Sequence, residues 1–256
     1  MSQPFLSVII PAYNEAERLP LTLVDIDKHL SKVEYGYEIL VVNDGSKDNT
    51  AEIVRAMSGM IKNLKLIDNE ANKGKGGVVR QGMLLAKGQI RLFTDADNST
   101  SVDQFKNMLP YLKDGYNIVV GSRTTNGAKL DPPEPLFRQI AGKGLNLVVQ
   151  TLLLPGIWDT QCGFKAFTAE AAERVFSLSR LTGWGFDVEV LALAKKLGYK
   201  IKEIPVHWVN DAVSRVKMSA GLQFLRDIIK IRWWLWTGAY ALLPNENRIE
   251  SNNHRM

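Results

Sequence analysis

The chain has 256 residues, of which 45% are apolar, which is enough for one large domain and argues against a wholly disordered protein. It carries 32 Lys and Arg against 27 Asp and Glu, a formal net charge of +5, which favours anionic partners such as phosphate-bearing substrates or an anionic membrane surface. No feature points to nucleic acid. The single cysteine, Cys162, excludes an intramolecular disulfide, and MSQPFLSVII is typical of a strand rather than a signal peptide, so we expect a cytoplasmic or cytosol-facing protein.

Short apolar runs rich in β-branched residues alternate with amphipathic stretches along the first half of the chain. Such runs are typical of strands buried on both faces of a parallel sheet, and apolar residues recurring every three or four positions are typical of helices. The predicted strands are 6–10, 38–43, 64–68, 90–94 and 117–121. The predicted helices are 19–30, 79–86 and 105–112. This alternation predicts an α/β fold, with a mostly parallel central sheet flanked by helices.

The second half continues the pattern and adds a C-terminal amphipathic helical extension. Its predicted elements are helices near 168–177 and 186–197 and a strand over 201–209. The longest stretch without a charged residue, 144–158, has 15 residues, fewer than the ~20 that a spanning helix needs. No repeat or low-complexity linker divides the chain. We predict one folded domain over 1–217, an amphipathic interfacial helix region over 218–243 and a disordered tail over 244–256.

Polar motifs follow four of the predicted strands, at the points where ligands bind in open parallel sheets. PAYNEAERLP follows the first strand, NDGSKDNT the second, NEANKGKGG the third and TDADNST the fourth. Because the carboxyl ends of parallel strands meet at one edge of a sheet, we expect these four loops to line one pocket.

Each motif alone has two interpretations. Asp44 is either a carboxylate that accepts hydrogen bonds from a base or ribose, or part of a plain turn leading into a capped helix. NKGKGG is either a main-chain site for a diphosphate or a flexible basic loop. Asp95 and Asp97 are either bound to a hard divalent cation or simply polar residues that end a buried strand. The motifs taken singly leave these alternatives open.

Taken together and in this order, PAYNEAERLP, VVNDGSKDNT, NKGKGG, DADNST and GSR closely resemble the motifs of family 2 inverting glycosyltransferases with the Rossmann-like GT-A fold, over residues 5–240. The nucleotide-sugar site that the resemblance implies consists of Pro11, Tyr13, Glu15, Asp44, Lys75 and Asp95. The resemblance also implies that Asp97 coordinates Mg²⁺ or Mn²⁺ at the diphosphate. Mannose synthases of the family often have a glutamine as a further metal ligand where this chain has Ser99. The expected metal is therefore held mainly by Asp97, the diphosphate and water.

Three motifs of the second half indicate which members of the family the chain resembles most. DTQCGFKAF, GWGFDVEVLALAKKLGY and IPVHWVNDAVSRVKM resemble the dolichyl-phosphate glucosyltransferases and, less closely, the dolichyl-phosphate mannose synthases. Enzymes of this kind transfer a sugar from a nucleotide to a polyprenyl monophosphate, and DTQCGFK favours UDP-glucose. The function that the resemblance implies is inverting transfer of glucose from UDP-glucose to a polyprenyl (dolichyl-type) phosphate. The alternative is a GDP-mannose-dependent mannose synthase.

A phosphate acceptor explains why the sequence shows no obvious general base. A phosphate monoester is already anionic near pH 7 and can attack directly, so the enzyme must bind and align it. The residues expected to contact the acceptor phosphate are Arg123, Arg138 and Lys217, which without the resemblance would be ordinary surface charges. The expected catalytic set is Asp95, Asp97 and Arg123. The residues expected to line or organise the acceptor side are Asp159, Gln161, Asp187 and Glu189. If the acceptor were a hydroxyl, Asp187 or Glu189 would be the candidate base.

Membrane attachment is expected from two amphipathic segments. Eukaryotic enzymes of this type begin with a spanning helix, which is not predicted among these residues. Residues 144–158 are apolar and follow Arg138 and Lys143, and 221–243 combine basic residues with tryptophans. Aromatic residues beside basic ones favour the membrane interface, which predicts a peripheral protein at the cytosolic face. The other interpretation is a core helix packed against the sheet or another subunit.

Two other classes of protein fit part of the sequence. A sugar-1-phosphate nucleotidyltransferase shares a Rossmann-like sheet, but it would carry a glycine-rich basic signature where this chain has PAYNEAERLP. A non-catalytic membrane-associated binding module would keep the C-terminal helix without needing Asp95 and Asp97.

Overall fold

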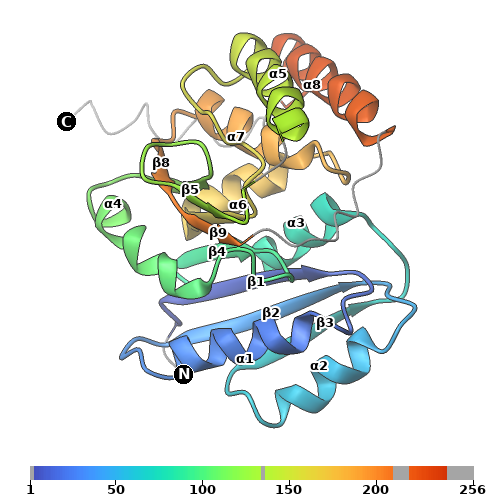
Figure 1. Cartoon of the computed structure of the whole chain (residues 1–256), viewed down its shortest axis with the longest axis vertical. Coiled ribbons are helices and arrows are strands. Elements are labelled where there is room, and N and C mark those ends of the chain that lie inside the picture. Colours follow the sequence, from blue (N-terminus) through green and yellow to red (C-terminus); the bar gives the residue numbers. More distant parts are fainter. Residues whose placement is uncertain (1–2, 134–135, 210–218, 241–256) are drawn as a thin grey trace, which may run out of the picture.

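The computed structural model describes residues 3–133, 136–209 and 219–240, and within these ranges it contains a seven-stranded sheet with helices on both faces (Figure 1). The strands of this sheet are β1 (Leu6–Ala12), β2 (Tyr37–Asp44), β3 (Leu64–Asn69), β4 (Ile90–Thr94), β5 (Ile118–Ser122), β7 (Phe164–Thr168) and β8 (Ile201–Pro205). Their order is β3-β2-β1-β4-β7-β5-β8, with β7 antiparallel to β4 and β5 and the other neighbours parallel. The predicted mostly parallel α/β fold is confirmed.

Side chains on the central strands alternate between two apolar cores, one on each face of the sheet. In β1, Leu6, Val8 and Ile10 belong to one core and Ile9 belongs to the other, as the two-residue period of a strand requires. The helices over the first core are α1 (Leu19–Leu30), α2 (Thr50–Ser58), the 3-10 helix η1 (Val102–Asn107) and α4 (Leu109–Lys113). The helices over the second core are α3 (Lys75–Leu85), α6 (Ala169–Leu178) and α7 (Phe186–Lys196).

The strand β3 differs from its prediction as a strand buried on both faces. It lies at the edge of the sheet, and Lys65 and Asp68 on it are exposed. Charged side chains on an edge strand hinder pairing with another chain. The apolar run 64–68 therefore predicts the strand correctly, but the prediction that this strand is buried on both faces was wrong.

Two predicted elements are divided in the structure, and a proline accounts for each division. The predicted helix over 105–112 is a 3-10 helix followed by α4, which has Pro110 in its first turn, where a missing N–H costs no hydrogen bond. The predicted strand over 201–209 ends as β8 at Pro205, which has no N–H to offer the ladder. The chain then enters a second, parallel pair of strands, β6 (Lys129–Asp131) and β9 (His207–Val209). Both predictions of a single element were wrong.

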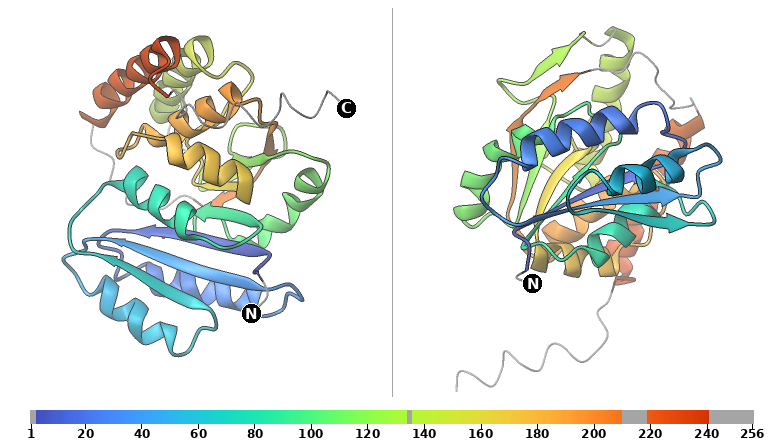
Figure 2. Two further views of the ribbon diagram at one scale, coloured as in Figure 1. Left: turned by 180° about the vertical axis from the view of Figure 1, so that it is seen from behind. Right: turned by 90° about the horizontal axis from the view of Figure 1, so that it is seen from below.

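A further pair of helices, α5 (Leu136–Leu152) and α8 (Ser219–Thr237), lies at the end of the molecule away from α1 and α2. The two helices run side by side, and α8 packs on α7 (Figures 1 and 2). On α8, Phe224, Ile228 and Ile231 are buried in the core, whereas Trp236 is exposed. The predicted C-terminal amphipathic helix is therefore present, with one face already packed against the protein.

None of the helices in the described ranges is long and apolar enough to cross a membrane. The apolar run 144–158 forms the second half of α5 and the turns after it, where Val149 and Leu154 are buried and Leu147 is exposed. The predicted domain boundary after residue 217 and the predicted tail, 244–256, lie outside the described residues. The division into three parts stays a prediction.

The close approach of α3 to β1 and β2 generates a test of the core. A Cβ on Gly82 would lie 2.5 Å from Cγ2 of Ile9 and 2.9 Å from Cγ2 of Val42. We expect Gly82→Ala to lower the free energy of unfolding by about 1–3 kcal/mol through overpacking. The control Gly144→Ala, in α5 with no atom within 4 Å of the new Cβ, should instead raise it by about 0.5–1 kcal/mol. Urea unfolding measures both, and equal effects of the two substitutions would contradict this account of the packing.

Candidate active site

The four polar loops meet at the carboxyl edge of the sheet, as expected, and direct contacts join each loop to the next. The backbone N–H of Asn14 donates to Oγ of Ser46 at 2.9 Å, which joins the loops after β1 and β2. The loop after β3 donates a backbone N–H to Asp44 at the end of β2. Lys75, which follows that loop, pairs with Asp95 after β4. The loops therefore form one continuous rim.

The loop after β1 is fixed by the loop after β2. Asn14 has a φ of +54°, a left-handed conformation that asparagine tolerates better than most residues. The N–H of Glu15 donates to Oγ1 of Thr50 at 2.9 Å. The Glu15 carboxylate pairs with Arg18 at 2.6 Å, so its charge is already balanced within the loop.

Three further residues of the expected nucleotide site lie at the carboxyl ends of β1 and β2 or directly after them. Pro11 is buried within β1, and Tyr13 in the next loop exposes 41% of its surface. Asp44 is buried at the end of β2, where it accepts the N–H of Lys73. Burial raises the pKa of Asp44 above its ordinary value, although the backbone N–H groups of Lys73 and Gly74 oppose this rise. Asp44 thus also anchors the loop after β3.

The glycines of NKGKGG pack against the protein itself. A Cβ on Gly74 would lie 2.5 Å from the carbonyl oxygen of Thr182. The N–H groups of Gly76 and Gly77 donate to that same carbonyl, at 2.8 and 3.4 Å. Because these donors at the start of α3 are already used, the contacts give no support to a main-chain diphosphate cradle. The two hydrogen bonds to Thr182 tie the start of α3 to the segment before α7.

Lys75 and Asp95 form an ion pair at the centre of the rim. The Lys75 Nζ lies 2.7 Å from Oδ1 of Asp95 and 4.9 Å from the ring centroid of Trp184. Burial alone would lower the pKa of Lys75, but the charges of Asp95 and Asp187 raise it above its ordinary value. The lysine therefore stays protonated at neutral pH and provides a fixed positive charge.

Asp95 lies against Gly163, a residue that was not among the predicted site residues. A Cβ at position 163 would lie 1.9 Å from Oδ2 of Asp95, so any other residue there would displace the Asp95 carboxylate. The sequence held a signal, the glycine inside DTQCGFK. It does not show that β7 runs antiparallel beside β4, with Phe164 paired to Thr94, and so brings that glycine against the aspartate.

Asp97 lies on the same loop and is half-buried. Its Oδ1 accepts the N–H of Ser99 at 3.0 Å. Between them, Asn98 has a φ of +54° and donates through its side chain to Oδ2 of Asp25 on α1, at 3.1 Å. Ser101 donates to the same oxygen at 2.7 Å. The loop that carries Asp97 is therefore anchored to α1.

The donor atoms present here fit a divalent cation only if the substrate completes its ligand shell. Asp95 is engaged by Lys75, which leaves the Asp97 carboxylate as the protein ligand that the geometry offers. Among the residues that the structure describes, no group of three His, Cys, Asp or Glu side chains is suited to hold a metal. Hard cations bind at least six oxygen atoms, so diphosphate oxygens and water would supply most of them.

A buried ion pair lies beneath the rim. Lys165, fully buried on β7, contacts the carboxylate of Asp187 and donates to the carbonyl of Cys162 at 2.6 Å. Burial raises the pKa of Asp187, and the charge of Lys165 opposes this rise. The charge of Lys165 also helps to lower the pKa of Asp159, an expected acceptor-side residue. Sequence reasoning missed Lys165, because one lysine in a short strand is typical of a solvent-facing position.

Glu189 is fully buried and is bound to the chain itself. Its carboxylate oxygens accept the N–H groups of Arg180 at 2.9 Å and Leu181 at 2.8 Å. The hydroxyl of Tyr240 donates to it at 2.7 Å. Burial raises the pKa of Glu189, against the effect of these three donors. These contacts fit an organising role better than that of a general base.

Arg123, directly after β5, binds Asp159 through both its main chain and its side chain. Its backbone N–H and Nε each donate to Oδ2 at 2.8 Å, and Nη2 donates to Oδ1 at 2.9 Å. The guanidinium also lies 4.8 Å from the ring centroid of Trp208. Burial would raise the pKa of Asp159, but Arg123 holds it below its ordinary value. These contacts hold the arginine in one orientation.

The remaining expected acceptor-side residues are only partly described. Gln161 is exposed, between Asp159 and the buried Cys162. Arg138 lies in α5, but its side chain is not among those that the structure describes, and Lys217 lies outside the described residues altogether.

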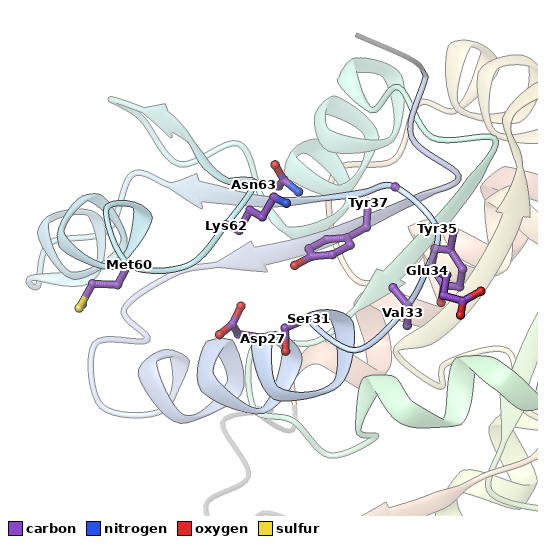
Figure 3. A pocket seen from close by; sticks show the side chains of 10 residues that line it. Asp27, Ser31, Val33, Glu34, Tyr35, Tyr37, Met60, Lys62 and Asn63 are labelled. Carbon is purple, nitrogen blue, oxygen red and sulfur yellow. The ribbon is translucent and has the colours of Figure 1, made fainter.

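A separate open pocket of about 370 Å³ lies at the other end of the sheet (Figure 3). Its lining includes Asp27 near the end of α1, Tyr37 at the start of β2 and Lys62 in the turn before β3. Because β2 runs from Tyr37 to Asp44, this pocket lies at the amino edge of the sheet and is distinct from the rim.

Sequence comparison relates the chain to known enzymes along nearly its whole length. Residues 7–176 match the model of glycosyl transferase family 2. The chain is 38% identical over 251 residues to dolichyl-phosphate beta-glucosyltransferase of Dictyostelium discoideum. This match covers 93% of this chain and 77% of the relative. It is 35% identical over 254 residues to the Homo sapiens enzyme of the same name, with 93% and 78% covered.

Solved structures share the fold. Glucosyl-3-phosphoglycerate synthase from Mycobacterium tuberculosis, in complex with UDP, has a TM-score of 0.65 at 20% identity, with 90% of this chain and 80% of that chain covered. Mannosyl-3-phosphoglycerate synthase from Rubrobacter xylanophilus has a TM-score of 0.68 at 16% identity, with 97% and 79% covered. With the family match over residues 7–176 and relatives above 30% identity, the chain belongs to glycosyl transferase family 2 and has the GT-A fold.

Proposed function

We propose that the chain transfers glucose from UDP-glucose to a polyprenyl (dolichyl-type) phosphate, with inversion at the anomeric carbon. The observation that carries this proposal is the relationship over 92–93% of the chain to the dolichyl-phosphate beta-glucosyltransferases of Dictyostelium discoideum, Homo sapiens and Saccharomyces cerevisiae. The carboxyl edge of the sheet supports it, because the rim carries a fixed lysine and two aspartates and a fixed arginine follows β5.

The loops after β1, β2 and β3 form the proposed donor side. We assign the nucleotide to Pro11, Tyr13, Glu15 and Asp44. Lys75 and Asp95 would lie at the diphosphate and the sugar. Because Lys75 is held by Asp95 and Trp184, its charge needs no reorganisation when a diphosphate arrives.

Asp97 would hold a divalent cation, Mg²⁺ or Mn²⁺, whose chemistry is to neutralise the charge that develops on the leaving UDP. Asp97 is the aspartate of the motif that is not paired with Lys75. A fold neighbour, the synthase from Mycobacterium tuberculosis, was crystallised with Mn²⁺ and UDP-glucose, which supports a metal of this class.

The acceptor phosphate would attack without help from a general base. A negative oxygen of the phosphate monoester forms the new bond to the anomeric carbon, while the bond from that carbon to UDP breaks and UDP leaves with the electron pair. No proton moves in this step. The buried carboxylates agree with this, since Asp187 is paired with Lys165 and Glu189 with backbone N–H groups.

Arg123 is the described residue that we assign to the acceptor phosphate. Its guanidinium is oriented by Asp159 and Trp208, and a fixed fork of N–H groups suits phosphate oxygens. Asp159, Gln161 and Asp187 would shape this side. The described contacts of Glu189, which was expected here too, lead instead to the segment that caps α3 on the donor side. Arg138 and Lys217 are assigned to the same phosphate by resemblance alone.

We place the outward face of α8 at a membrane surface. The exposed apolar residues of this face are Leu222, Ile229, Trp233 and Trp236, which follow helical spacing. The exposed basic residues of the helix are Arg226, Lys230 and Arg232. An apolar stripe with basic neighbours suits the interface of an anionic membrane, where a polyprenyl tail resides. The single, buried Cys162 needs no oxidising compartment, which supports the cytosolic face.

The donor assignment is tested with the purified chain, a short polyprenyl phosphate and Mn²⁺. We expect lipid-linked glucose from UDP-glucose, measured by mass spectrometry, and at least roughly tenfold less product from GDP-mannose. Product from GDP-mannose alone would make the chain a mannose synthase. Formation of UDP-glucose from UTP and glucose 1-phosphate would instead favour the nucleotidyltransferase.

The metal assignment is tested with Asp97→Ala. We expect kcat to fall roughly a hundredfold or more, because the leaving charge loses its counter-ion, with little change in melting temperature. The control Asp103→Ala removes a partly exposed carboxylate from η1 that pairs with Lys106, and it should keep full activity. Activity that survived both Asp97→Ala and EDTA would refute the metal role.

The membrane assignment is tested with a Trp233→Ser, Trp236→Ser double variant. Sedimentation with vesicles of phosphatidylcholine and phosphatidylserine should show binding weakened roughly tenfold or more, because apolar area that enters the interface is lost. Leu21→Ser, which removes an exposed apolar side chain from α1, should bind like the unaltered chain. Equal binding by all three proteins would rule out α8 as the docking face.

A further inference from the structure

The segment 179–185 lies directly behind Lys75. The carbonyl of Thr182 accepts the N–H groups of Gly76 and Gly77, so the segment caps the start of α3. The ring of Trp184, in the same segment, lies 4.9 Å from the Lys75 Nζ. Lys75, the first residue of α3, is therefore held through its helix and through its side chain by one short segment.

Glu189 holds this segment from the other side. It accepts the consecutive N–H groups of Arg180 and Leu181, one on each carboxylate oxygen. A carboxylate bound in this way fixes the path of the main chain just before Thr182. Because Glu189 is fully buried in α7, its own position is set by the core.

Tyr240, beyond the end of α8, binds Glu189 in turn. We call the contacts of Glu189 and Tyr240 that hold the segment 179–185 the clamp. The Tyr240 hydroxyl donates to Oε1 of Glu189 at 2.7 Å, the oxygen that also accepts from Arg180. The Arg180 guanidinium binds the carbonyl of Ala239 and lies 5.4 Å from the Tyr240 ring centroid. Burial and the charge of Glu189 raise the pKa of Tyr240 well above its ordinary value, so the hydroxyl keeps the proton that it donates.

The same segment is tightly packed at its end. A Cβ on Gly185 would lie 2.6 Å from a carboxylate oxygen of Asp227 on α8. The segment is thus enclosed between α8 and α3.

We propose that Glu189 and Tyr240 are positioning residues, which fix the segment 179–185 and through it hold Lys75 in its pair with Asp95. Neither residue touches the donor in this account. The proposal rests on the proposed function in one respect, that Lys75 lies at the donor diphosphate. The clamp itself is a property of the ligand-free protein.

Tyr240→Phe tests the clamp by removing one hydroxyl while keeping the ring that packs on Trp234. In the ligand-free protein, hydrogen exchange measured by mass spectrometry should show faster exchange of residues 74–78, by roughly fivefold, the change that one lost hydrogen bond produces. The matched control is Tyr199→Phe, which removes a Tyr–Glu hydrogen bond of 3.2 Å to Glu170. It should leave residues 74–78 unchanged. Unchanged exchange in Tyr240→Phe would overturn the proposal.

Kinetics of the same variants test the consequence for Lys75. Tyr240→Phe should raise the KM for UDP-glucose roughly fivefold while the KM for polyprenyl phosphate stays constant. Glu189→Gln, which keeps one carbonyl oxygen for two N–H groups, should give the same pattern with a larger change. An equal rise of both KM values, or a fall in kcat alone, would overturn the positioning role. If the chain had no transferase activity, the exchange experiment would still decide the clamp.

Discussion

The ion pair between Lys75 and Asp95 is the contact on which the rim depends. It joins the start of α3 to the end of β4, and each partner is restrained from a second side, Lys75 by Trp184 and Asp95 by Gly163. In a partly buried setting such a pair interacts more strongly than a surface pair in water. The orientation of Asp95 is therefore determined by packing, before any substrate is bound.

Two ion pairs, one above the other, balance the charges of the lysines and aspartates at the site. The upper pair is Lys75 and Asp95 at the rim, and the lower pair is Lys165 and Asp187 within the core. Removing one partner of the lower pair would leave an uncompensated buried charge, which is costly. Because Lys165 also binds the carbonyl before Gly163, the lower pair supports the close approach that orients Asp95.

Local sequence signals predicted the strands of the first half and the convergence of their loops, because apolar runs and polar strand ends lie within a few residues of each other. Pro110 and Pro205 could have predicted the two divided elements, since a proline lacks the N–H that an unbroken helix or strand would need at that position. Gly163 and Lys165 could not be found in this way. Their roles arise from the register of β7, a five-residue strand whose partner in β4 lies about seventy positions away.

The antiparallel strand β7 lies between β4 and β5 and separates two groups of strands that are each parallel within themselves. The loops proposed for the nucleotide follow β1 to β4 on one side, and Arg123 follows β5 on the other. The two groups meet along the backbone ladder of β7, which pairs with β4 on one side and β5 on the other. A shift in the register of β7 would therefore displace Gly163 and Lys165 from Asp95 and Asp187, so the donor side depends on the same strand that carries the acceptor side beside it.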